Sequence, residues 1–305
     1  MHERKVKLIV NPNADLGRAE HKASSLKSIT QEFGGVDWVK TAYPTHATEL
    51  AQQAATDGYE LVIAAGGDGT THEVVNGLMQ VAPERRPKLG VIPLGSGNDF
   101  AFAVGMHPEP EYALRQIFTG SPKLVDVGRV VDNNGRVEYW NNALGIGFDA
   151  IVTIRSRRFT AFRGFLIYLL AVLQTILFNS KAPSYRIRTD HRSWTDRLLL
   201  FILCNGNREG GGFHVYPSAK VNDGIFNYIG IPQVSRFTML RLLIEVMRGS
   251  HLNFHLTRHG TFTEMEIEAD QNLVVHTDGE IFAGFNTNVH SLKINLIPAA
   301  IQVVC

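Results

Sequence analysis

Three glycines and a carboxylate follow an apolar stretch in the first quarter of the chain. The segment 64–78 reads AAGGDGTTHEVVNGL, with Asp68 among the glycines. The run 61–65 predicts a buried strand, and Thr70 and Glu73 have the spacing of a capping box at a helix start. Such a start offers free N–H groups and a partial positive charge, and glycines let an anion approach the backbone. The segment favours a phosphate site, with a plain strand–helix turn as the alternative.

A second glycine loop repeats this design. The segment 89–105 reads LGVIPLGSGNDFAFAVG, in which Ser96 and Asp99 again have a capping spacing. Asn11 ends the first predicted strand, and the carboxyl ends of parallel strands meet at one edge of a sheet. Asp68 and Asp99 could both reach that edge, and paired carboxylates beside a phosphate indicate Mg²⁺. The alternative for Asp99 is a helix-capping acid.

Several familiar motifs do not fit these loops. No G-x-x-x-x-G-K sequence is present, which excludes a P-loop. His72 stands where a dinucleotide fingerprint would need its third glycine, and Asn76 replaces the second histidine of a zinc H-E-x-x-H motif. The protein-kinase signatures H-R-D and D-F-G are also missing.

The elements that must position the loops alternate in type. Strand-like runs at 5–10, 36–40, 59–65 and 89–94 are separated by helical patterns, one of which Thr45 is expected to cap. A continuous apolar strand is typical of a parallel sheet covered on both faces. This order predicts a right-handed parallel sheet with helices on both sides.

The pattern changes from about Val125. The segment 133–135 is a hairpin signal, and more strand-like runs follow it to the end of the chain. Two helical stretches, at about 159–178 and 236–248, interrupt these runs. The fold class we predict is therefore α/β plus all-β, with a parallel-sheet domain followed by a β-sandwich.

Composition limits the classes of function. The 305 residues suggest two domains, which we place at 1–124 and 125–305, with the extreme C-terminus free to pack back on the first. The net charge of +1 excludes a bulk attraction to nucleic acid. Two cysteines form no disulfide framework and are typical of a reducing compartment. The apolar run at 8–10 is too short for a signal-peptide core, so we expect a cytoplasmic protein.

The pairing of GGDGTTHEVVNGL with PLGSGNDFA resembles the lipid kinase family of soluble bacterial diacylglycerol kinases, their broader-specificity relatives, and sphingosine and ceramide kinases. NALGIGFDA, NGNREGGGFHVYPSAKVNDG and HTDGE also resemble family signatures, in family order. The shorter GGDGT element is shared with NAD kinases and phosphofructokinases. The resemblance implies a nucleotide-binding α/β domain like that of NAD kinases and phosphofructokinases, followed by a β-sandwich lipid-binding domain. It also implies an active site in the cleft between them.

The resemblance also implies roles for particular residues. Those assigned to ATP are Asn11, Thr41, Gly66, Gly67, Asp68, Gly69, Thr70, Thr71, His72, Glu73, Ser96 and Asp99. Asp68 and Asp99 would hold the catalytic Mg²⁺. Glu280 matches the general base of the family, with Asp68 as the other candidate. A structural Mg²⁺ would lie at Asp223, with main-chain oxygens near Lys220 and Ile225. Asp15 departs from the family pattern in the first loop.

Two apolar stretches raise the question of a membrane. Residues 164–178 are nearly all apolar, but fifteen residues are fewer than the roughly 20 that a span needs. Nine basic residues against two acids between Arg155 and Arg197 give a local balance of +7. Together with the arginine-containing stretch 236–248, this favours peripheral docking on anionic lipid. Two core helices with solvated arginines are the alternative.

The function that these patterns favour is an ATP-dependent lipid kinase, most simply one that converts diacylglycerol to phosphatidic acid. The alternatives are a kinase of another lipid alcohol such as a long-chain base or ceramide, a kinase of NAD, and a non-catalytic lipid- or nucleotide-binding protein. The sequence leaves the oligomeric state open, a homodimer included.

Overall fold

The chain folds into two compact units. The computed structural model describes residues 5–17, 19–159, 165–178 and 182–305. Unit 1 comprises Met1–Val127 with Pro298–Cys305, and unit 2 comprises Gly128–Ile297. Each junction lies within a strand, in β5 (Pro122–Asp132) and in β15 (Ser291–Val304).

Unit 1 is built on a parallel sheet. Its strands are β1 (Val6–Val10), β2 (Asp37–Lys40), β3 (Leu61–Gly66) and β4 (Lys88–Pro93). They pair in the order β4-β3-β1-β2. All of these pairs are parallel, and a parallel sheet is what the sequence predicts. The end of β15 joins this sheet, where Val303 pairs in parallel with Leu89.

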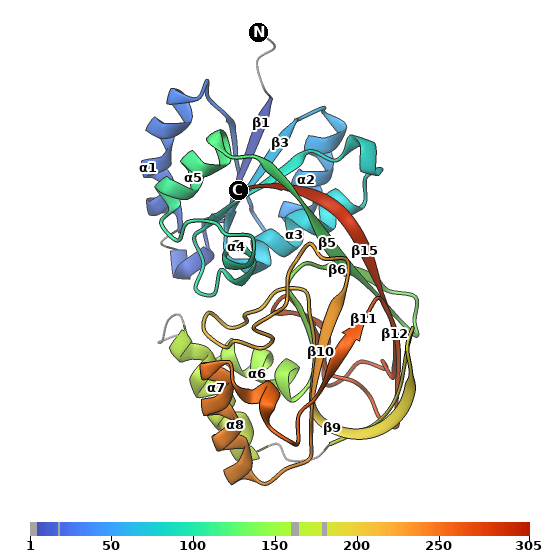
Figure 1. Cartoon of the computed structure of the whole chain (residues 1–305). Helices are drawn as coiled ribbons and strands as arrows, with labels where there is room; N and C mark the ends of the chain where they lie inside the picture. The colour runs from blue at the N-terminus through green and yellow to red at the C-terminus, as the bar shows by residue number, and fades with distance from the viewer. Residues whose placement is uncertain (1–4, 18, 160–164, 179–181) are drawn as a thin grey trace. The chain divides into compact units, whose positions relative to one another are not determined.

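Helices cover both faces of this sheet (Figure 1). They are α1 (Ala19–Glu32), α2 (His46–Thr56), α3 (Asp68–Met79), α4 (Asp99–Ala103) and α5 (Pro110–Thr119), with 3₁₀ turns at Ala14–Gly17 and Pro83–Arg85. Helix α1 packs with α5, and α2 packs with α3. The second pair is close because Gly77 lacks a side chain: a Cβ there would lie 2.3 Å from the Thr48 carbonyl oxygen.

Unit 2 consists mainly of antiparallel strands. They are β6 (Val137–Trp140), β7 (Ala143–Gly147), β8 (Ser184–Thr189), β9 (Ser193–Cys204), β10 (Phe226–Pro232), β11 (Arg258–Phe262), β12 (Glu264–Ala269), β13 (Val275–Thr277) and β14 (Glu280–Ala283). They pair as β14-β13-β7-β9-β8-β12-β15, while β10 joins β9 to β11, and β5 pairs with β6 and β15. Trp140, Tyr185, Phe226 and Phe262 are among the aromatic side chains of its core.

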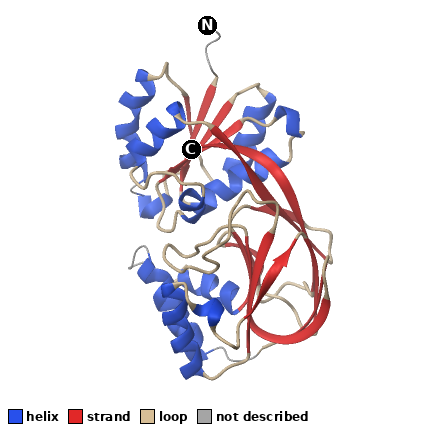
Figure 2. Ribbon diagram, in the orientation of Figure 1, coloured by secondary structure: helices blue, strands red, loops and turns tan. Residues whose placement is uncertain are grey.

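Three helices lie together on one side of the unit 2 strands, as Figure 2 shows. They are α6 (Phe148–Ser156), α7 (Phe165–Phe178) and α8 (Arg236–Arg248), followed by a 3₁₀ turn at His251–Asn253. The helix expected at 159–178 is described from Phe165, because residues 160–164 lie outside the described part of the chain. Among the described residues, no helix has both the length and the apolar character to cross a bilayer.

Helix α6 is not predicted from the sequence. Its residues Ile151, Val152, Thr153 and Ile154 are β-branched, which lowers intrinsic helix propensity. The helix forms because Phe148 and Val152 join a buried apolar cluster with α7 and α8. Tertiary packing therefore overrides the local preference.

Candidate active site

The two glycine loops of unit 1 are in contact with each other. Strand β3 ends at Gly66 and strand β4 at Pro93, and both loops follow at the same edge of the sheet. A Cβ on Gly95 would lie 2.3 Å from the Cα of Gly67. The glycines are therefore needed for the loops to pack together, as well as for an anion to approach their backbone.

Asp68 links the two loops. Its Oδ1 accepts hydrogen bonds from the backbone amides of Asp99, at 2.7 Å, and of Phe100, at 3.2 Å. Asp68 therefore caps the start of α4 from the other loop. The capping role predicted for the Ser96–Asp99 spacing is wrong, because Asn98 occupies the N-cap position in a left-handed conformation and makes no side-chain cap.

Glu73 caps a helix other than its own. The capping box predicted between Thr70 and Glu73 is wrong, because α3 begins at Asp68 and both residues lie inside it. The Glu73 carboxylate instead accepts from the amides of Thr45, at 2.9 Å, and Ala47, at 3.0 Å. Thr45 is the N-cap of α2 as expected, but its side chain makes no cap hydrogen bond.

Several predicted nucleotide residues meet at the strand ends. The Asn11 amide donates to Thr70 Oγ1 at 3.0 Å, and the backbone N–H of Asn11 donates to Ala65. Thr41 directly follows β2, and its N–H donates to Val10. Ser96 is exposed in the loop after β4. With Gly66–Thr70, these residues lie at the ends of neighbouring strands on the edge of the sheet where α3 begins, and a helix N-terminus favours an anion.

Three of the predicted phosphate side chains are turned into the protein. Thr70, Thr71 and His72 are buried, and His72 Nε2 lies 3.2 Å from the Asn76 amide nitrogen within α3. Glu73 serves α2, as described above. Apart from Glu73, the part of the GGDGTTHE motif that remains partly exposed is therefore Gly67 to Gly69.

In unit 2, the HTDGE motif forms the turn between β13 and β14. Asp278 and Gly279 both have positive φ, at 52° and 85°, as a tight hairpin turn requires. The Asp278 carboxylate accepts from the backbone amides of Asn141, Asn142 and Ala143 at 2.8 to 3.0 Å. These bonds fix the turn against the start of β7.

Glu280 follows this turn and is half-exposed. Its Oε2 accepts from the Arg157 guanidinium at 2.7 Å, and the same guanidinium group donates to the Gly279 carbonyl at 3.1 Å. Arg157 stands at the C-cap of α6. The helix that the sequence misses therefore holds the candidate general base.

His276 connects the same turn to the other end of α6. It is fully buried, and its Nε2 contacts Asp149 at 2.7 Å and Glu209 at 3.1 Å. The backbone N–H of Gly279 lies 3.1 Å from its Nδ1. Burial lowers the pKa of His276, but the two carboxylates outweigh burial and raise this pKa to about 10.

The cluster of Asp149, Glu209 and His276 has the spacing of a metal site, since one ligand atom from each residue lies within 4.8 Å of the others. The protons on the His276 ring argue against a metal ion. The Gly279 N–H faces Nδ1, so the neutral ring carries its proton on Nε2, the nitrogen that would have to bind the metal. The charged ring carries a proton on both nitrogens. Nε2 is protonated in either state, so the cluster is better described as a buried hydrogen-bonded link.

The sequence analysis did not single out four residues of this arrangement: Arg157, Asp149, His276 and Asp278. Two of them lie in the signature HTDGE and one in NALGIGFDA, but the motifs alone do not show which side chains meet. Their contacts join segments more than 120 positions apart in the chain. Only the folded structure brings them together.

The residues predicted for a structural Mg²⁺ share one loop before β10. Lys220, Asp223 and Ile225 are exposed, and Asp223 Oδ1 accepts from the Ile225 amide at 3.3 Å. A carboxylate with neighbouring main-chain oxygens has the hard-oxygen character that Mg²⁺ prefers. The residues are chemically suited to the ion, and the metal remains a prediction.

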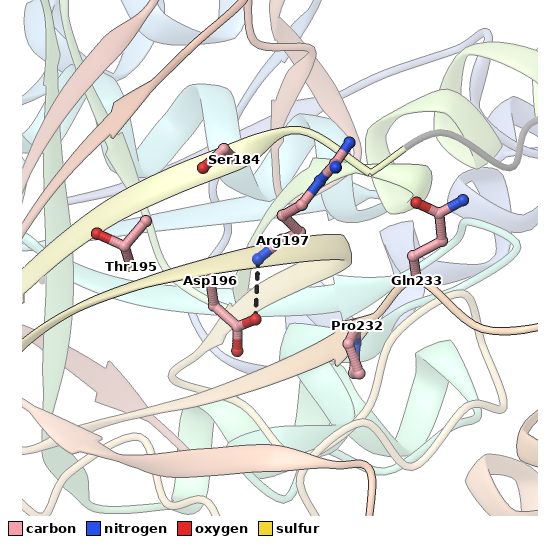
Figure 3. Close-up of a pocket in the computed structure, with 6 residues that line it drawn as sticks. All are labelled: Ser184, Thr195, Asp196, Arg197, Pro232 and Gln233. Carbon is pink, nitrogen blue, oxygen red and sulfur yellow. Dashed lines mark hydrogen bonds between the residues drawn. The ribbon is translucent and has the colours of Figure 1, made fainter.

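A hollow of about 430 Å³ lies elsewhere in unit 2, and Figure 3 shows its lining. It is formed by Ser184, Thr195, Asp196, Arg197, Pro232 and Gln233. Asp196 is already paired with Arg258 at 3.5 Å and accepts from the Arg197 backbone. None of the predicted site residues lines it, so we do not assign the chemistry to this hollow.

Comparison with known proteins agrees with this arrangement. Residues 5–130 match the diacylglycerol kinase catalytic domain, and residues 142–305 match the YegS C-terminal NAD kinase beta sandwich-like domain. These matches define the class of the protein as a lipid kinase with a catalytic α/β domain and a β-sandwich-like domain. The chain belongs to the family of bacterial diacylglycerol kinases and YegS lipid kinases.

Relatives from several bacteria cover most of the chain. A probable lipid kinase YegS-like of Chromohalobacter salexigens is 34% identical over 241 residues, which cover 76% of this chain and 73% of that protein. The diacylglycerol kinase of Bacillus subtilis is 29% identical over 283 residues, or 91% and 90% of the two chains. A solved diacylglycerol kinase structure from Bacillus anthracis str. Sterne has a TM-score of 0.72 at 23% identity, covers 100% of this chain and 97% of that one, and supports the fold.

Proposed function

We propose that this lipid kinase transfers the γ-phosphate of ATP to a lipid hydroxyl, and that its acceptor is diacylglycerol. The observation that supports this most directly is the pair of glycine loops linked by Asp68 at the carboxyl ends of β3 and β4. One relative is named a diacylglycerol kinase and others are named lipid kinases, which favours a lipid alcohol over a soluble acceptor.

Phosphoryl transfer depends on positioning and on neutralising charge. We assign the phosphates of ATP to the backbone of Gly66–Thr70 and the N-terminus of α3. Asn11 holds Thr70 in place through its side-chain amide. Mg²⁺, when bound, supplies positive charge at the phosphates, and the carboxylates suited to hold it are those of Asp68 and Asp99.

The structure favours Glu280 over Asp68 as the general base. Asp68 Oδ1 is committed to the amides of α4, so moving Asp68 would disturb the second loop. Glu280 is half-exposed at the start of β14, where a substrate hydroxyl can reach it. Arg157 orients the Glu280 carboxylate before the proton is transferred.

A labelled-ATP assay against a panel of acceptors tests the proposed function. The panel contains diacylglycerol, ceramide, a long-chain base and NAD, each with and without Mg²⁺. We expect label on diacylglycerol, dependent on Mg²⁺. Label on another lipid would correct the acceptor, and label on NAD alone would contradict the lipid kinase proposal.

Asp68→Asn provides the matched control for this assay. The amide keeps an oxygen that can accept from Asp99 and Phe100, so the link between the loops is retained while the charge is lost. We expect an unchanged melting temperature and turnover lowered by about 100-fold or more, because charge stabilisation is lost at the phosphates.

A further inference from the structure

Helix α8 of unit 2 has two apolar faces. Met239, Leu242, Leu243 and Val246 pack into the interior with α7 and strand residues. A second stripe, formed by Phe237, Leu240, Ile244 and Met247, is exposed, and Phe237 is 85% exposed. At about 100° per residue, this stripe is centred about 130° away from the buried face. The exposed stripe therefore takes no part in the core contacts of the helix.

Exposed apolar side chains of unit 2 concentrate on α8 and its neighbour. Among the described residues of unit 2, ten large hydrophobic side chains are exposed, and seven of them belong to α7 or α8. Those on α7 are Leu166, Leu177 and Phe178, and Phe178 is 71% exposed. The two helices pack side by side (Figure 1). Single exposed hydrophobics are ordinary, but a grouping of this kind marks an interaction surface.

The charges on α8 indicate what kind of partner this surface meets. Arg236, Arg241 and Arg248 are exposed, whereas the one acid of the helix, Glu245, is half-buried and bonded to Ser250. Arginines lie on both sides of the stripe, where their guanidinium groups can reach lipid headgroups while the stripe enters the acyl boundary. Basic groups around an apolar stripe are complementary to an anionic bilayer.

The sequence also pointed to the basic region 155–197, and three of its described arginines are paired with acids. Arg186 pairs with Glu268 at 3.0 Å, and Arg188 pairs with Glu266 across the β8–β12 pair. Arg157 is paired with Glu280. Acids from a later strand and turn therefore neutralise these three arginines, whereas among the described residues the arginines of α8 are not paired in this way, so we place the docking surface on α8.

A second copy of the chain fits the exposed stripe of α8 less well than a bilayer does. In a two-fold contact between α8 helices the same surface meets itself. In an antiparallel pair, Arg236 of one copy would lie close to Arg248 of the other. The two positive charges would repel each other at both ends of the apolar stripe and weaken the contact.

We propose that the exposed stripe of α8, with its flanking arginines, docks this protein on anionic membranes. The α8 stripe lies in the interfacial plane, and the exposed end of α7 at Phe178 contributes beside it. This inference rests on the proposed function, since a lipid kinase must reach a substrate that stays in the bilayer.

Vesicle flotation of the full chain tests the docking surface without relying on catalysis. The vesicles contain phosphatidylcholine alone or phosphatidylcholine with phosphatidylglycerol, at low and high salt. We expect binding to the anionic vesicles, weakened by salt. Phe237→Ser with Ile244→Ser should weaken it by about tenfold or more, because two buried side chains are lost. Arg236→Gln with Arg248→Gln should weaken it by roughly fivefold per arginine.

Two matched controls make the experiment specific. Arg186→Gln with Arg188→Gln removes the same charge from the paired strand arginines, and Phe285→Ser removes an exposed aromatic outside α7 and α8. Both should float like the wild type. Equal binding by the α8 variants, or equal loss in the controls, would overturn the proposal.

Sedimentation and activity separate the remaining outcomes. If Phe237→Ser with Ile244→Ser splits a dimer and leaves flotation unchanged, the stripe binds a second copy and the docking proposal is wrong. Turnover of a short-chain diacylglycerol in detergent should be unchanged in the α8 variants. Absence of turnover in every protein would count against the kinase proposal, whereas flotation decides the docking proposal by itself.

Discussion

Arg157 and Glu280 form the contact that most directly concerns the chemistry. Their side chains meet at 2.7 Å, and Arg157 also holds the Gly279 carbonyl. The pair orients a carboxylate that follows a tight turn, and the orientation of a base matters as much as its basicity. In the proposed mechanism, Arg157 is therefore a positioning residue that acts through Glu280.

A double-mutant cycle tests this relation. Glu280→Gln should lower kcat by about 100-fold or more, with the KM for ATP unchanged, and Arg157→Ala by about tenfold. The double variant should be no slower than Glu280→Gln, because Arg157 has no role once the carboxylate is gone. Arg158→Ala, the exposed neighbour, is the control. Losses that multiply in the double variant would show that Arg157 acts independently.

His276 makes stability depend on pH. Its two carboxylate neighbours raise the pKa to about 10 from an ordinary value of 6.5, so the folded protein binds the extra proton more tightly than the unfolded chain. The resulting stabilisation is fully present below about pH 6.5 and is lost as the pH rises towards 10. The Gly279 amide beside Nδ1 opposes the second proton and reduces the size of the effect.

Chemical denaturation between pH 6 and 10 measures this effect. The difference in unfolding free energy between wild type and His276→Gln should shrink by about 1–3 kcal/mol over this range. His290, which is exposed, provides the control variant His290→Gln. A difference that stays constant with pH would show that His276 has the same pKa in the folded and the unfolded protein and would contradict this prediction.

The contact between the glycine loops positions α3 and α4 together. Gly95→Ala would place a Cβ 2.3 Å from the Gly67 Cα, so one loop must move. Because Asp68 follows Gly67 and caps α4, both helix starts should shift. We expect a loss of turnover of at least about tenfold, since small displacements of positioning groups are costly.

A matched glycine provides the control for this loop prediction. At Gly284 an added Cβ would have Ile281 Cγ2, at 4.0 Å, as its nearest neighbour. Gly284→Ala should keep the turnover and the melting temperature of the wild type. If Gly95→Ala is equally well tolerated in both measurements, the close contact of the loops is not needed for catalysis.

The end of β15 makes unit 1 depend on a distant part of the chain. Val303 is fully buried and pairs with Leu89, while the preceding part of the strand belongs to unit 2. Val303→Asp should cost about 3 kcal/mol or more, because it buries a carboxylate in the core. Calorimetry should show a lower unfolding temperature, whereas Val137→Asp, at an exposed position, should have little effect. Equal melting of the two variants would mean that β15 is not needed for unit 1.

The sequence by itself determined the order of strands and helices in unit 1 as far as α4, together with the two glycine loops, but it did not indicate α5. This was possible because buried parallel strands are continuous apolar runs and because loops at their carboxyl ends carry glycine and capping residues. It also indicated many of the antiparallel strands of unit 2 and helix α8. These signals are local, so no tertiary information was needed to find them.

Only the tertiary structure decided which side chains hold the site together. Asp68 caps α4, Glu73 caps α2, and His276 and Arg157 tie the Glu280 turn to α6. A capping spacing in the sequence specifies a helix start, but the backbone amides can be satisfied by any acceptor that the fold brings near. Likewise, the sequence shows how many arginines a stretch contains, whereas the fold decides which of them meet an acid from another strand and which stay exposed beside the apolar stripe of α8.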